Sequence, residues 1–232
     1  MDHDMAQIAR QRLADITGAL MLLTRLPVPA RLPARHGAQG AWAWPLAGLA
    51  VGGIGAATAA LAAPLGPPIA AALALAAMAA ATGGLHEDGL ADTFDGLWGG
   101  QTPARRLEIM KDSHIGSYGV LALIFVTLIR WQALAALLAA DQWGGLLAAA
   151  CLARAPMAVI SAALPNARNR GLSAMTGRPA AGTAAAAAAL ALMIALITTS
   201  APLTMALAAA LAALGLAAVA RARIGGQTGD IL

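Results

Sequence analysis

The chain has 232 residues, of which 59% are hydrophobic and only 11% are charged, whereas an average soluble domain carries roughly 25% charged residues. This balance excludes an ordinary soluble domain and favours a membrane protein. The net charge of +4 comes without a basic patch that carries interleaved aromatics or a nucleic-acid-binding module, so no nucleic acid is expected as a partner. The single cysteine, Cys151, excludes a disulfide framework.

The first 12 residues are polar, and the apolar stretch after them is interrupted by Arg25 and Pro27. This is not the pattern of a cleaved signal peptide. Residues 13–26 predict an amphipathic helix that lies along the membrane surface.

Further along, the chain alternates between apolar stretches and polar connections. A membrane-spanning helix needs about 20 mostly apolar residues, and six stretches reach or approach that length. The predicted fold is therefore all-α, a polytopic helical bundle that forms a single transmembrane domain over residues 1–232. Because Ala, Leu, Gly and Val dominate the apolar residues, we expect close helix packing through small side chains. The six predicted spans are 42–63, 67–85, 117–139, 143–163, 181–199 and 202–220.

The distribution of basic residues predicts the orientation. All but two of the 15 Lys and Arg residues lie in the segments 1–40, 86–116, 164–180 and 221–232. The positive-inside rule then places both termini and the long loops in the cytoplasm. We expect a bacterial inner-membrane protein whose polar site, on the loops at about 86–116 and 164–180, faces the cytoplasm.

The two remaining basic residues, Arg130 and Arg154, fall within the third and fourth predicted spans. A charge at that depth is costly, so each should face the bundle interior, an aqueous cavity or a counter-charge. A functional role for Arg154 and a purely structural pair are both open.

The second span runs into GGLHEDGLADTFDGLWGG, residues 83–100. If this segment is helical, Asp88, Asp92 and Asp95 stand at i, i+4 and i+7 and share one face. Like charges on one face repel, so a cation is expected there. The six glycines in the segment are unfavourable in a regular helix and predict either a break or a close approach by substrate or another backbone.

Carboxylate oxygens suit Mg²⁺, which proteins usually hold with a few carboxylates together with substrate phosphates and water. We therefore predict a Mg²⁺ site with Glu87, Asp88, Asp92 and Asp95 as candidate ligands. The alternative, a solvated acidic turn, would normally include neutralising Lys or Arg, and none occurs between Arg35 and Arg105. An EF-hand Ca²⁺ loop is excluded by the spacing. The neighbouring His86 is a candidate base, metal ligand or ordinary interfacial residue.

Two further polar segments lie on the same predicted side. KDSHIGSYG, at 111–119, offers Lys111 and His114 for phosphate and Asp112 as another possible ligand. NARNRGLSAMTGR, at 166–178, is suited to clamping phosphates, although ordinary positive-inside anchoring explains it equally well. The tail RARIGGQTGD, at 221–230, adds a third polar element.

These motifs resemble those of one family, adenosylcobinamide-GDP ribazoletransferase, also called cobalamin 5′-phosphate synthase. The resemblance spans nearly the whole chain. In the family the last motif is usually followed by another apolar segment, whereas this sequence stops at Leu232, so the resemblance leaves open both a missing C-terminal helix and a naturally shorter form. The matching elements are GGLHEDGLADTFDG at 83–96, KDSHIGSYG at 111–119, ARNRGL at 167–172 and GGQTGD at 225–230.

The resemblance implies an enzyme that joins adenosylcobinamide-GDP to α-ribazole, or its 5′-phosphate, and releases GMP. It implies Mg²⁺ as cofactor, a diphosphate held by Lys111 with one of Arg154, Arg168 or Arg170, and a proton acceptor among Asp92, Asp95 and His86. The lipid bilayer is the expected surrounding, and a homo-oligomer is left open.

Two rival functions remain at this point. The aspartate spacing is similar to elements of the CDP-alcohol phosphotransferase signature, although Leu97 and Trp98 replace the expected Ala-Arg. A transporter or Mg²⁺ channel would distribute acidic groups over several helices, whereas the predicted spans are nearly free of carboxylates.

Overall fold

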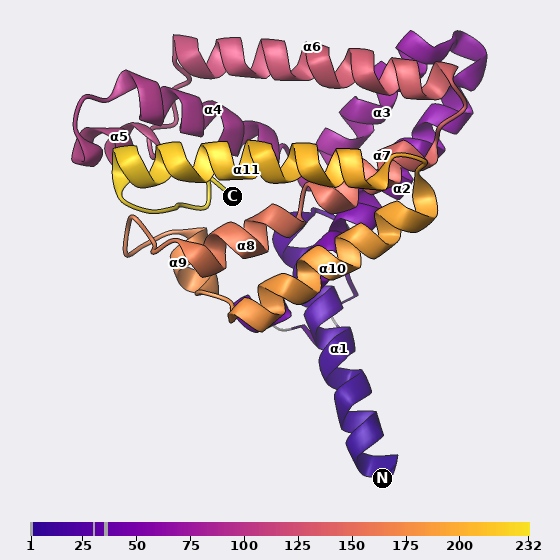
Figure 1. Cartoon of the computed structure of the whole chain (residues 1–232), viewed down its shortest axis with the longest axis horizontal. Helices are drawn as coiled ribbons and strands as arrows, with labels where there is room; N and C mark the ends of the chain where they lie inside the picture. The colour runs from indigo at the N-terminus through magenta and orange to yellow at the C-terminus, as the bar shows by residue number, and fades with distance from the viewer. Residues whose placement is uncertain (1, 30, 35–36) are drawn as a thin grey trace.

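The computed structural model describes residues 2–29, 31–34 and 37–232, and the regular structure within them is helical. Long apolar helices form a bundle, and the short helices Pro103–Ile109 and Leu172–Thr176 lie at the same end of it (Figure 1). The α-helices are α1 Asp2–Leu23, α2 Trp44–Ala62, α3 Pro67–Thr82, α4 Leu85–Gly99, α5 Pro103–Ile109, α6 Ser117–Ala139, α7 Gly144–Leu152, α8 Ala155–Ala163, α9 Leu172–Thr176, α10 Ala181–Thr198 and α11 Pro202–Ile224; two 3₁₀ helices cover η1 Ala38–Ala43 and η2 Ala63–Leu65.

The predicted membrane spans are confirmed in type and in approximate position. Five stretches of the described chain are long and apolar enough to cross a membrane, and the pair α3 and α4 makes a sixth if this bent pair is one span. The fourth predicted span consists of two helices, because α7 ends at Leu152 and α8 begins at Ala155. Residues 13–23 of the predicted amphipathic helix at 13–26 belong to the longer α1, which ends at Leu23 and projects from the bundle (Figure 1).

Small residues set the distances between the central helices, as predicted. A Cβ atom added to Gly48 of α2 would lie 2.3 Å from the carbonyl oxygen of Ala150 in α7, and one added to Gly52 would lie 2.9 Å from the Ala150 side chain. These glycines allow α2 and α7 to meet backbone to backbone, the kind of contact that stabilises helices in lipid.

The predicted helix break occurs at Gly83 and Gly84, which have φ values of +67° and +71°. This left-handed conformation is unfavourable for residues that carry a Cβ atom. Gly83 ends α3, and the Gly84 N–H donates back to the carbonyl of Ala79 at 2.8 Å. The chain then starts α4 at an angle of 88° to α3, which turns the acidic residues away from the axis of the preceding helix.

The polar segments gather at one end of the bundle. In Figure 1, α5, α9 and the C-terminus lie at the end where α6 begins, whereas the short connections after α2, α6 and α10 lie at the opposite end. The last turn of α11 is attached to this polar end, because the Arg223 guanidinium donates to the carbonyl of Leu97 at 2.6 Å and lies over the Trp98 ring. The residues after α11 are thereby delivered beside α4.

Candidate active site

The acidic face of α4 forms as predicted, because residues 85–99 are helical. Asp88 is exposed, Asp92 is partly buried and Asp95 is buried. The carboxylates of Asp88, Asp95 and Asp230 all lie within electrostatic range of Asp92, and the Arg168 cation opposes their repulsion. Asp92 is therefore the centre of a strongly negative cluster.

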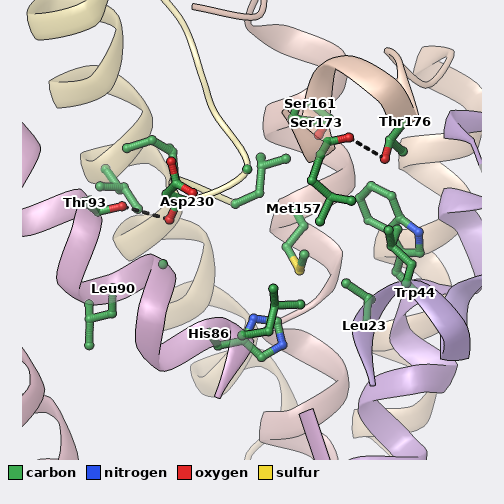
Figure 2. Close-up of a pocket in the computed structure, with 18 of the residues that line it drawn as sticks. Leu23, Trp44, His86, Leu90, Thr93, Met157, Ser161, Ser173, Thr176 and Asp230 are labelled. Carbon is green, nitrogen blue, oxygen red and sulfur yellow. Dashed lines mark hydrogen bonds between the residues drawn. The ribbon is translucent and has the colours of Figure 1, made fainter. Parts of the chain in front are cut away.

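The C-terminal segment brings Asp230 to this cluster. The Thr93 hydroxyl donates to the backbone carbonyl of Asp230 at 2.8 Å, and a Cβ added to Gly89 would lie only 3.1 Å from the same oxygen. The predicted close approach of another backbone to the glycine-rich helix is thus confirmed at Gly89. Thr93 and Asp230 come together although they are far apart in the sequence (Figure 2).

A cation pairs with Asp230 at the edge of the cluster. The Arg168 Nη2 lies 2.7 Å from Oδ2 of Asp230, and the Thr228 hydroxyl donates to the same oxygen at 3.1 Å. Both charged side chains are largely buried, with exposures of 15% and 20%. The Nη1 of Arg168 is buried and has no hydrogen-bond partner within the described residues, so an anionic ligand at this edge of the cluster would satisfy it.

Hydrogen bonds hold the Arg168 and Asp230 segments together. The Ala167 N–H donates to the Gln227 carbonyl at 2.8 Å, and the Gln227 N–H donates to the Pro165 carbonyl at 2.9 Å. The buried Gln227 amide also contacts Asn166 and accepts from Ser173. The motifs at 167–172 and 225–230 therefore form one rigid unit beside α4.

We expect Arg168→Gln to raise the KM for a phosphate-bearing substrate by about 10- to 100-fold, the equivalent of one lost hydrogen bond to a charged group. The exposed neighbour Arg170 is the matched control, and Arg170→Gln should change the KM by no more than about twofold. Steady-state kinetics at saturating second substrate measure both. Equal KM values for the two variants would contradict a phosphate role for Arg168.

Asp95 has a structural environment different from that of Asp92. Its exposure is 7%, and its two carboxylate oxygens accept the backbone N–H groups of Gly116 at 2.7 Å and Gly119 at 2.9 Å. A Cβ added to either glycine would lie 2.4 Å from an Asp95 oxygen. Asp95 therefore fastens the first turn of α6 to α4.

Asp95→Asn should lower the free energy of unfolding by about 1–3 kcal/mol, because the amide NH₂ cannot accept one of the two buried N–H groups. Thermal unfolding of the purified protein measures the change, with Asp112→Asn as an exposed control. Unchanged stability in Asp95→Asn would contradict this structural role.

Other predicted phosphate ligands line an outer groove. Lys111, Asp112 and Arg168 border one cavity of about 480 Å³ together with Arg105. Within the exposed loop, a hydrogen bond to Asp112 raises the pKa of His114, and the same bond lowers the pKa of Asp112. His114 and Arg170 are exposed and do not border the groove.

A second group of predicted residues lies in an inner chamber of about 470 Å³ between α2, α3, α6 and α7. The Glu87 carboxylate forms an ion pair with Arg130, with 3.0 Å between Oε1 of Glu87 and Nη1 of Arg130. Arg154, 8% exposed, borders the same chamber and donates to the carbonyl of Ala150 at 3.2 Å. The expectation that both arginines face a cavity or counter-charge is confirmed, but the structure separates Glu87 and Arg154 from the outer acidic cluster.

The acidic cluster can bind Mg²⁺ only if a substrate supplies further ligands to the ion. No group of three or more His, Cys, Asp or Glu side chains is assembled for a metal ion in the part of the chain that the structure describes. Mg²⁺, however, is usually bound by one or two carboxylates plus substrate phosphates. Asp88 and Asp92 on adjacent turns provide such a pair, so the donor set suits an ion that arrives with a diphosphate.

Three site residues are additions to the sequence prediction, namely Asp230, Thr228 and Thr93. The tail motif that contains Asp230 was expected on the polar side, but its pairing with Arg168 and its contact with α4 depend on the tertiary fold. The glycines at 225, 226 and 229 are the sequence signal, since a glycine-rich segment ending in an acid is suited to close backbone approach.

The comparisons with known proteins agree on one family. A family model described as Cobalamin-5-phosphate synthase matches residues 15–232. An adenosylcobinamide-GDP ribazoletransferase from Bradyrhizobium diazoefficiens is 46% identical, over 96% of this chain and 88% of the relative. The protein of the same name from Azorhizobium caulinodans is 44% identical over 94% and 89%, respectively. No solved structure matches the chain.

Proposed function

Because this chain belongs to the cobalamin-5-phosphate synthase family, we propose that α4, the 166–173 segment and the 225–230 segment form its active site. The reaction is the final assembly of cobalamin, in which adenosylcobinamide-GDP reacts with α-ribazole or its 5′-phosphate and GMP is released. The observation that carries the assignment is the convergence of Asp92, Asp230 and Arg168 from three separate segments at the polar end of the bundle.

In this proposal, Asp88 and Asp92 would hold Mg²⁺ together with the diphosphate of adenosylcobinamide-GDP. When bound, the ion would supply charge neutralisation for the diphosphate and the GMP leaving group. Arg168 contributes a fixed positive charge through its unpaired Nη1, and Lys111 and Arg105 border the same outer groove as Arg168. Glu87 is assigned to the Arg130 pair, and Asp95 to the attachment of α6.

The transfer itself is a phosphodiester exchange. The ribose 3′-oxygen of the ribazole forms a bond to the phosphorus that carries the cobinamide side chain, and the bond from this phosphorus to the oxygen of GMP breaks. Asp230 accepts the hydroxyl proton at Oδ1, since Oδ2 is engaged by Arg168 and Thr228. The contact between Thr93 and the Asp230 backbone fixes this carboxylate in place, so the residues act mainly by positioning and charge neutralisation.

The membrane location supports the same arrangement. The long apolar helices need lipid around them, and the polar end carries Arg105, Arg106, Lys111, Arg168 and Arg170. Under the positive-inside rule this end faces the cytoplasm. The proposal is thus an inner-membrane enzyme that takes both water-soluble substrates from the cytoplasmic side.

Purified protein in detergent or lipid tests the proposal directly. With adenosylcobinamide-GDP and α-ribazole 5′-phosphate, we expect GMP and cobalamin 5′-phosphate in equal amounts. Chelation of divalent metal should stop the reaction, and added Mg²⁺ should restore it. GMP without the cobalamin product would indicate hydrolysis, and turnover of a CDP-lipid in its place would favour the CDP-alcohol phosphotransferase rival.

A further inference from the structure

A small cavity of about 220 Å³ lies directly beside the proposed reaction centre. Figure 2 shows Thr93 and Asp230 on one side of it, Met157 at its middle, and Leu23 and Trp44 on the opposite side. Asp230 is therefore shared by the cavity and the acidic cluster. A ligand that fills the cavity would place its exposed end next to the carboxylate proposed to accept the proton.

The walls of the cavity are mainly apolar. Leu23, Trp44, Leu90 and Met157 supply flat or adaptable surfaces from four different helices, which is the lining expected around an aromatic ring. The hydroxyls of Thr93, Ser173 and Thr176 also line the cavity, but each already donates a hydrogen bond within the protein. Ser161, His86 and Asp230 supply the remaining hydroxyl, imidazole and carboxylate groups of the lining. The buried Nε2 of His86 has no hydrogen-bond partner within the described residues.

The chemistry of the two substrates decides between the possible occupants. The corrin ring is too large for a cavity of about 220 Å³. The guanine base has polar groups on most of its edge, and an apolar wall would leave many of them unpaired at a cost of roughly 1–3 kcal/mol each. The base of α-ribazole is a dimethylbenzimidazole, which is planar and apolar apart from one free ring nitrogen.

We propose that this cavity binds the benzimidazole base of the ribazole substrate and so determines which bases the enzyme accepts. The inference rests on the proposed function. With the base beside Met157, the ribose lies at the side of the cavity that Asp230 and Thr93 line, and its hydroxyls face these two residues. His86 is a positioning residue that contacts the ring nitrogen of the base.

A cavity-filling substitution tests the proposal. Met157→Phe should raise the KM for α-ribazole 5′-phosphate by about 10-fold or more, the effect of misfitting roughly one methylene or more in an apolar pocket. The KM for adenosylcobinamide-GDP should stay within about twofold. Val159→Phe, on the exposed side of the same helix α8, is the matched control and should alter neither KM.

A size series of bases provides the second test. The unmethylated benzimidazole riboside phosphate should lose less activity than the dimethyl compound in Met157→Phe. In Met157→Ala, a larger tricyclic base should gain relative to the natural one. This reciprocal pattern is not expected from a variant that is merely less stable.

Three results would overturn the inference: equal rises in both KM values, an unchanged KM for the ribazole in Met157→Phe, or the same loss for every base. The same loss for every base would mean that the cavity only contributes to helix packing or that it holds a lipid chain. Failure of the proposed function is distinguishable, because the unmodified protein would then release no GMP.

Discussion

Replacement of Asp92 by Asn is expected to lower kcat by roughly a thousandfold or more, about 4 kcal/mol of transition-state stabilisation. Asp92 is the carboxylate that interacts electrostatically with Asp88, Asp95 and Asp230. The amide has nearly the same shape but no charge, so it removes a metal ligand without creating a cavity. The measurement is GMP release in a single turnover with both substrates saturating.

The control for Asp92→Asn is the state of folding. Because the change removes charge repulsion in the cluster, the thermal unfolding midpoint should be unchanged or raised, in contrast to Asp95→Asn. A folded Asp92→Asn protein that retains more than about a tenth of the activity would be incompatible with metal-ligand loss at this residue.

Asp230→Asn has the second largest expected effect, a fall in kcat of about 10²- to 10⁴-fold, which is the usual contribution of a general base. The substitution leaves the backbone hydrogen bond from Thr93 intact, because that bond is to the carbonyl oxygen of residue 230. The C-terminal segment should therefore stay in place while the proton acceptor is lost.

The split between kcat and KM separates this role from a purely structural one. Asp230→Asn should lower kcat while the KM values for both substrates stay within about twofold, because the change removes a group that acts in the transition state. The exposed Asp112→Asn variant is the control and should keep the kcat of the unmodified protein. An Asp230→Asn protein with unchanged kcat would assign the proton to another group.

The sequence was sufficient for features that depend on local pattern. Apolar stretches predicted the spans, and the six glycines of residues 83–100 predicted a break or a close approach, which the structure has at Gly83 and Gly84 and at Gly89, respectively. The spacing of Asp88, Asp92 and Asp95 placed them on one helix face. Each of these features follows from periodicity or backbone conformation within about 20 residues, which is the range over which sequence patterns are informative.

Features that depend on long-range packing could not be predicted. Nothing local to Asp95 shows that it will accept two N–H groups from α6, or that Glu87 will turn to Arg130 in the inner chamber. The pairing of Arg168 with Asp230 joins residues 62 positions apart. The sequence therefore located the acidic helix, but the tertiary contacts decide which carboxylates face the substrates.

The inner chamber is a polar region separate from the outer acidic cluster. The Arg130 and Glu87 pair and the buried Arg154 lie among apolar side chains, where an unpaired charge is costly. Their position apart from Arg168 and Lys111 explains why the predicted set of phosphate ligands does not meet at one place.

The central claim, that the acidic face of α4 holds a divalent ion together with the substrate diphosphate, is tested most directly by Mn²⁺ binding followed by electron paramagnetic resonance. We predict weak binding to the protein alone, tight binding after adenosylcobinamide-GDP is added, and loss of the tight binding in Asp92→Asn but not in Asp112→Asn. Tight binding without the diphosphate, or equal binding by the Asp92→Asn protein, would contradict the claim.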